Sequence, residues 1–201
     1  DSKGLLGDHL AVGARSVYVA FAGQTASADA GFAAQVNQVT AVENYSPLAN
    51  LFMAFNFSPA WGMELGWNQF SAEAQNAAGD VDGEFQLAGP MLSLFWRYAN
   101  SSIVTPYLGL GAGWYSVTFK DSGWWSSGNN SQASYDAGEP GTGIMREMSV
   151  NDAPGFLGYL GTDVRIWKGL YLDFLVRYIY LQSDVSIIGR DGAGGGAFEY
   201  G

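Results

Sequence analysis

Apolar and polar residues alternate with a period of two along most of the chain, and clusters of Gly, Pro, Asn, Asp and Ser bound the alternating segments. This pattern is typical of β-strands whose two faces differ. Many segments run past ten residues, as expected of strands that cross ~25 Å of hydrocarbon at a tilt. The sequence predicts seven strands, at His9–Phe21, Leu48–Phe57, Trp61–Ser71, Phe85–Tyr98, Val104–Phe119, Ala153–Ile166 and Leu170–Leu181.

The connections between these strands alternate in length. Short turns follow the second, fourth and sixth strands, whereas long polar loops are expected at about 22–47, 72–84, 120–152 and 182–196. Bacterial outer-membrane barrels have the same arrangement, with tight turns on one rim and large loops on the other. The predicted fold class is all-β. Residues 1–201 form one domain, a transmembrane antiparallel up-and-down β-barrel of eight strands, of which seven are clear and the eighth is short or truncated.

Side-chain parity separates a membrane barrel from a soluble one, because successive side chains of a strand point to opposite faces. Met63 and Leu65 share one face of their strand, and Glu64 lies on the other. In a soluble barrel the water-facing side would include Val19 and Phe21, which is too apolar for an exterior. With the apolar face in lipid, all seven strand charges enter the lumen, where opposite charges can pair. The predicted lumen charge cluster is Arg15, Glu64, Arg97, Asp163, Arg165, Asp173 and Arg177.

Composition agrees with this assignment. Only 14% of the residues are charged, and the strands hold three of the 19 acidic and four of the nine basic residues, so the net charge of −10 lies mainly in loops and chain ends. Such a balance argues against nucleic acid as a partner. The charge-free runs Asn44–Met63 and Tyr98–Phe119 contain proline or repeated glycine, which argues against membrane helices. An aromatic girdle is expected at the short-turn rim, from Trp61, Trp96, Tyr98, Trp167 and Tyr171.

Two absences in the sequence bear on its chemistry and on its export. Cysteine is absent, so there is no disulfide framework and no thiolate metal site. No signal peptide is visible at Asp1, which fits either a mature form or a protein that is not exported.

Few residues have the pattern of a catalytic or metal site. His9 is the only histidine, and the sequence places no Ser or carboxylate partner beside it, so we expect no enzyme activity, catalytic residue, cofactor or metal. Asp80-Val-Asp82-Gly-Glu84 does not have the spacing of a calcium loop and is expected to form a solvated acidic hairpin tip. Gly109-Leu-Gly111-Ala-Gly113 lies within a strand, where small residues relieve crowding in a narrow lumen.

Two features bear on the passage of molecules. Pro90 lies inside the fourth strand and cannot donate a ladder hydrogen bond, so it marks either a β-bulge near the strand end or a gap in the barrel wall. On the loop side, the inward positions are largely apolar. The predicted apolar mouth consists of Val19, Phe21, Phe70, Phe85, Leu87, Val117, Phe119, Leu157 and Ile179.

Four sequence motifs resemble the OmpW family of small outer-membrane barrels. They are Trp61-Gly-Met-Glu-Leu, Gly89-Pro-Met-Leu-Ser-Leu-Phe-Trp-Arg-Tyr98, Thr105-Pro-Tyr-Leu-Gly-Leu-Gly-Ala-Gly-Trp-Tyr115, and Gly161-Thr-Asp-Val-Arg-Ile-Trp167 followed by Leu170-Tyr-Leu-Asp-Phe. The resemblance implies an eight-stranded barrel that takes up small hydrophobic molecules and releases them sideways near a proline in the fourth strand, a position that Pro90 matches. The chain departs from the family after Asp184, where the remaining residues are Gly-rich: either Ala197–Gly201 begins a strand, or closure is unusual.

The expected function is an outer-membrane barrel of a Gram-negative bacterium that binds or passively conducts small hydrophobic molecules, with Pro90 as lateral gate. Its expected surroundings are outer-membrane lipid and lipopolysaccharide. The alternative is a structural or adhesive barrel whose loop at 120–152 binds a protein partner, a lattice neighbour or lipopolysaccharide. Trp124 and Trp125 in this loop are the candidate anchors, because exposed aromatic residues often anchor protein interfaces.

Overall fold

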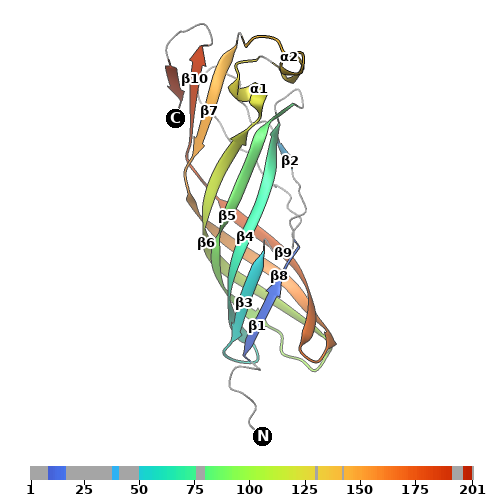
Figure 1. The fold of residues 1–201 in the computed structure, drawn as a ribbon. Coiled ribbons are helices and arrows are strands. Elements are labelled where there is room, and N and C mark those ends of the chain that lie inside the picture. The colour runs from blue at the N-terminus through green and yellow to red at the C-terminus, as the bar shows by residue number, and fades with distance from the viewer. Residues whose placement is uncertain are drawn as a thin grey trace.

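The computed structural model describes residues 9–16, 38–40, 50–75, 80–129, 131–141, 143–191 and 197–200. Its main element is an antiparallel sheet in the order β1-β3-β4-β5-β6-β8-β9, with β2 paired to β4. The sheet curls into a barrel wall, and β8 and β9 pass behind β1 and β3 (Figure 1). The strands are β1 (Leu10–Ala14), β2 (Gln38–Thr40), β3 (Leu51–Asn56), β4 (Trp61–Gln75), β5 (Val81–Arg97), β6 (Val104–Asp121), β8 (Ala153–Trp167) and β9 (Leu170–Leu181).

The predicted antiparallel barrel fold is confirmed, and each of the seven predicted strands overlaps one strand of this sheet. The short β2 lies in the loop predicted at 22–47. β4 and β5 are longer than expected and shorten the loop that was predicted at 72–84. Their ladder continues from Trp61↔Trp96 to Gln75↔Val81, because cross-strand pairing extends beyond the apolar alternation into polar residues. The wall therefore rises above its apolar band on this side.

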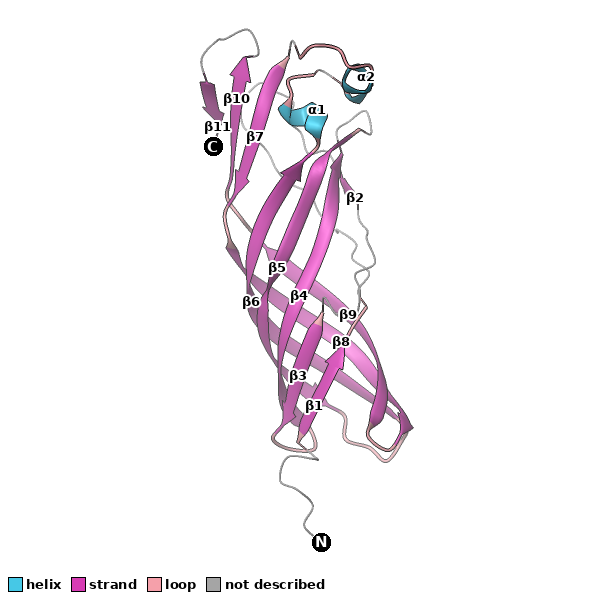
Figure 2. Ribbon diagram, viewed as in Figure 1, coloured by secondary structure: helices cyan, strands magenta, loops and turns pink. Residues whose placement is uncertain are grey.

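The rim above the barrel contains short elements in segments predicted as loops, and a strand at 197–200, where a strand was one of the two alternatives. They are α1 (Gly123–Ser126), α2 (Gln132–Asp136), β7 (Ile144–Val150), β10 (Val185–Asp191) and β11 (Ala197–Tyr200). The last three form a small sheet in the order β11-β10-β7, beside the helices (Figure 2). The loops predicted at 120–152 and 182–196 therefore contain strands, which are short and carry charged residues that obscure an apolar period. Of the helices in the described ranges, none has the length and apolar character needed to cross a bilayer.

Among the described residues, β11 does not belong to the barrel wall. β11 pairs with β10 on the rim, so Ala197–Tyr200 does not join β1. Within the described ranges, β1 pairs only with β3 and β9 only with β8. Side chains connect these two edges instead: Arg15 Nε lies 2.6 Å from Asp173 Oδ2 across the lumen. An ion pair therefore bridges the first and last strands of the wall.

The two faces of the wall are as parity predicts. Along β9 the outward residues are apolar and exposed, with 72% of Val176 accessible. On β4 the inward Glu64 is only 3% exposed, between the exposed Met63 and Leu65. At the short-turn rim, exposed aromatic side chains form the expected girdle, with Trp96 half-buried beside them. Its exposed members are Trp61, Tyr98, Trp167 and Tyr171.

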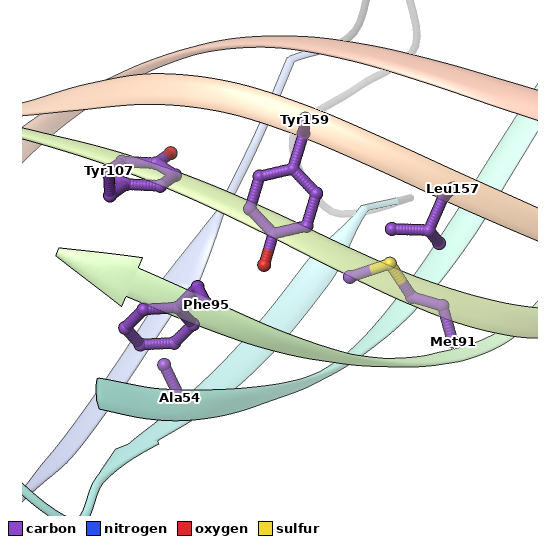
Figure 3. Packing of buried hydrophobic residues seen from close by; sticks show 6 residues of the cluster. All are labelled: Ala54, Met91, Phe95, Tyr107, Leu157 and Tyr159. Atoms are coloured by element: carbon purple, nitrogen blue, oxygen red, sulfur yellow. The ribbon is translucent and has the colours of Figure 1, made fainter.

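The lumen is filled by large side chains that lie opposite glycines. Gly109 pairs with Tyr159 and Gly161 with Tyr107 across the β6–β8 ladder. A Cβ on Gly109 would lie 2.4 Å from the Tyr159 ring, and one on Gly161 would lie 2.5 Å from the Tyr107 ring. The aromatic rings converge with Met91 and Leu157 in the lumen (Figure 3). Gly109 thus provides the space that the sequence analysis predicts.

Replacing Gly109 with alanine should destabilise the barrel, because the new methyl group displaces the Tyr159 ring. That ring is fixed by its hydroxyl, which lies 2.8 Å from Ser93 Oγ. Overpacking of this kind costs about 1–3 kcal/mol, measured as the free energy of unfolding in detergent micelles. Gly158→Ala is the matched control, since a Cβ there lies at an ordinary 3.4 Å from Leu110. Equal effects of the two substitutions would contradict the packing role of Gly109.

Candidate functional site

The lower lumen contains a network of four charged side chains, which we call the ionic floor: Arg15, Glu64, Asp173 and Arg177. Arg15 donates two hydrogen bonds to the Glu64 carboxylate, at 2.7 and 2.8 Å. Arg177 Nη2 lies 3.3 Å from Glu64 Oε1. With the Arg15–Asp173 pair, the network joins the end of β1 to β4 and β9. Bidentate and shared pairing of this kind offsets much of the cost of burying the charges.

A second pair lies nearer the short turns, where Arg97 Nη2 is 3.1 Å from Asp163 Oδ2. Six of the seven charges predicted for the lumen therefore have an oppositely charged partner inside it. Arg165 is the exception, because its side chain is exposed at the end of β8. The β8–β9 ladder keeps its register as far as Arg165↔Tyr171 and shifts only beyond it, before Trp167. Arg165 thus lies at the open short-turn end of its strand, and its place in the lumen cluster stays a prediction.

Three buried tyrosines add polar groups that the sequence analysis missed. The Tyr107 hydroxyl donates to Asp173, the Tyr115 hydroxyl accepts from Asn68 Nδ2 at 3.0 Å, and the Tyr159 hydroxyl contacts Ser93. Their odd numbers place them on the inward face of β6 and β8, so strand parity could have identified them. They line the lumen between its charged and apolar parts.

The upper lumen is a packed apolar layer. Its buried residues are Phe70, Leu87, Tyr115 and Val117, with Phe85, Ile179, Val150 and Leu181 packed against them. Of the other predicted mouth residues, Leu157 belongs to the lower cluster and Phe119 contacts the rim. Val19 and Phe21 lie outside the described residues. The described part of the predicted mouth is thus filled by side chains that a ligand would have to displace.

The wall has an interrupted ladder at Pro90. Between β5 and β6 the partners are Ala88↔Ser116 and then Met91↔Gly113, and no pairing joins Gly89 or Pro90 to β6. The next pair lies three positions further along each strand, so the register is unchanged. The alternative of a β-bulge at Pro90 is therefore wrong. The strands remain close, because a Cβ on Gly89 would lie 1.9 Å from the Trp114 carbonyl oxygen. Pro90 itself is exposed on the outer face.

The rim covers this lumen with a small apolar cluster of its own. Trp124 and Trp125 are each 2% exposed and pack with Phe119, Met148 and Val185. The indole nitrogen of Trp124 donates to the Val81 carbonyl at 2.9 Å. These tryptophans are therefore not the exposed anchors that the sequence suggested. They hold α1 against β5 and β7 instead.

Asp82 also differs from its expected role in a solvated tip, because it is only 5% exposed. Its main-chain oxygen accepts hydrogen bonds from Ser122 N and Oγ, at 2.8 and 2.7 Å. The carboxylate oxygen Oδ1 is buried without a hydrogen-bond partner among the described residues. Asp82 lies beyond Glu84, the first outward-facing charge on β5, and hence above the apolar band.

The curled antiparallel sheet, its apolar outer face and its charged lumen define the class of protein, an outer-membrane-type β-barrel. Neither a protein-family model nor a curated protein matches the sequence. Among solved structures, the crystal structure of the outer membrane protein OprG from Pseudomonas aeruginosa matches with a TM-score of 0.53. The identity is 18%, and the match covers 75% of this chain and 67% of OprG. At this identity the likeness bears on the barrel fold, which the two chains share.

Substituting Glu64 with glutamine should strongly destabilise the barrel, because it removes the carboxylate shared by Arg15 and Arg177. Breaking a buried ion pair on one side costs about 3–5 kcal/mol, measured as the free energy of unfolding in micelles. Glu73→Gln, on the exposed upper part of β4, is the control and should change stability by less than about 0.5 kcal/mol. A Glu64→Gln protein as stable as the control would exclude a structural role for the ionic floor.

The attachment of α1 to the rim should weaken as pH rises from about 4 to 6. Burial raises the pKa of Asp82 to about 6; Arg146 opposes this shift and Asp80 adds to it. Since the carboxyl of an unfolded chain titrates near ~3.9, the folded rim binds the proton more tightly and is stabilised by low pH. Hydrogen exchange of the Ser122 amide, compared with Asp82→Asn at each pH, measures this change. Equal pH dependence in both proteins would contradict it.

Proposed function

We propose that this protein is an outer-membrane barrel of a Gram-negative bacterium that binds or passively conducts small hydrophobic molecules and releases them sideways into the membrane. The observation that carries the proposal is the division of the lumen into an apolar upper layer and an ionic floor. The likeness of the fold to that of OprG supports an outer-membrane location.

The ionic floor makes straight passage of an apolar molecule unfavourable. Such a molecule would have to separate Arg15 from Glu64 or Asp173, and it offers neither charge a replacement partner. Separating buried ion pairs without compensation is expensive. The apolar layer of Phe70, Leu87 and Val117 offers weaker, non-directional contacts that can rearrange around a small apolar guest.

Lateral release is most favourable where the wall has the fewest hydrogen bonds to break. In lipid, parting two strands exposes main-chain groups that no water satisfies. The β5–β6 ladder has no pairing at Gly89 and Pro90, so an opening there loses less than an opening elsewhere along this ladder. The exposed outer side chains beside it, Trp67 and Trp114, are apolar and continue into the lipid-facing surface.

Uptake of a small apolar fluorescent solute into liposomes containing the full chain tests this proposal. Pro90→Ala restores a main-chain N–H that can extend the ladder, so uptake should fall about two- to tenfold, the equivalent of one hydrogen bond. Pro154→Ala is the matched control, because Pro154 faces the same Trp114 from β8 within a continuous ladder. It should leave uptake unchanged.

Two outcomes would contradict the proposal. Wild-type protein that gives no more uptake than protein-free liposomes would exclude conduction. Equal uptake by wild type, Pro90→Ala and Pro154→Ala would exclude an exit at Pro90. The alternative of an adhesive barrel rested on exposed tryptophans in the loop at 120–152. Trp124 and Trp125 are instead buried in the rim cluster.

A further inference from the structure

The two rims of the barrel differ in the sign of their charge. The described residues of the three short turns, 57–60, 98–103 and 165–171, include Arg165 and Lys168 and no carboxylate. The opposite rim is rich in acids, among them Asp82, Glu84 and Asp121. In a chain with a net charge of −10, the described short turns are thus locally cationic.

The two cations lie in an open cleft of about 400 Å³ at the β8–β9 turn. This turn is at the end of the barrel opposite the helices (Figure 2). Gly169 has a φ of 85°, a left-handed conformation that allows the chain to reverse within the short turn after Lys168. Within the described residues, neither Arg165 nor Lys168 has an ion pair. Both charges are therefore available to an anionic ligand.

The other walls of the cleft are amphipathic or apolar. Trp167, 74% exposed, and Tyr171 belong to the aromatic girdle, and Ile103 and Ile166 are exposed beside them. Tryptophan and tyrosine prefer the depth of lipid head groups, which places this cleft where bilayer phosphates lie. Cations beside an apolar wall suit a ligand with an anionic head and a hydrocarbon tail better than a free anion.

We propose that this cleft binds the head group of an anionic phospholipid in the leaflet at the short-turn rim. Arg165 and Lys168 contact the phosphate, while Ile103, Ile166 and Trp167 contact the glycerol backbone and the upper part of the acyl chains. The site rests on the proposed placement of the barrel in a bilayer, and it is independent of Pro90 and of solute passage. It also gives a role to Arg165, the strand charge that has no ion pair among the described residues.

Native mass spectrometry of the full chain in micelles tests the site. Equal amounts of phosphatidylglycerol and phosphatidylcholine are added, and the retained lipids are compared. Wild type should retain phosphatidylglycerol preferentially. Arg165→Gln and Lys168→Gln should each reduce this preference about fivefold, the contribution expected of one cation near an anionic surface. Lys120→Gln, at the exposed acidic rim, is the matched control and should keep it.

Both side chains are exposed, so the variants should fold like wild type, and circular dichroism checks this. A wild type without lipid preference, or a double variant that keeps it, would overturn the assignment. Loss of phosphatidylglycerol to millimolar inorganic phosphate would assign the cleft to a free anion instead. Apolar solute uptake is measured in phosphatidylcholine liposomes with the same variants. Because the double variant should conduct like wild type, failure of the lipid site and failure of the conduction proposal give different results.

Discussion

The pairing of Arg15 with Glu64 and Asp173 is the interaction on which the rest of the barrel depends. It joins the residue that follows β1 to β4 on one side and β9 on the other. The described edges of the sheet share no main-chain ladder, so this ion pair is a direct link between its first and last strands. In a wall whose outer face is apolar, the inner face is the place where charges can be satisfied, and each charge there needs a partner of opposite sign.

The remaining lumen is organised around this network. Glycines of one strand face aromatic rings of the next, as Gly109 faces Tyr159 and Gly161 faces Tyr107, so large rings fit into a narrow interior. The tyrosine hydroxyls then contact polar partners, and Tyr107 donates directly to Asp173. Above them the interior changes to a packed apolar layer. The lumen thus changes from charged to apolar at a boundary along its length.

The two rims have different environments. The long-loop rim is covered by α1 and the β11-β10-β7 sheet, with Trp124 and Trp125 as its core. The short-turn rim is a ring of aromatic side chains with two unpaired cations among its described residues. Aromatic and cationic groups suit a phospholipid surface, and acidic groups suit water or its cations. Among the described residues, the unpaired positive charges and the surplus of negative charges thus lie at opposite ends of the barrel.

The period of two in the sequence determined the seven longer strands of the wall, their order and their two faces. Those features follow from local alternation: Val176 points outward and Glu64 inward because neighbouring side chains leave a strand on opposite sides. Parity also assigned seven charges to the interior, and six of them have an oppositely charged partner there. The tertiary structure decided what depends on register and on contacts between distant segments. Ion pairing joined Arg15 to Glu64 and Asp173, an unshifted register excluded a bulge at Pro90, and packing against Phe119 buried Trp125. The alternation of residues specifies the face of the strand on which a side chain lies. The pairing of the strands specifies which other side chains it contacts there.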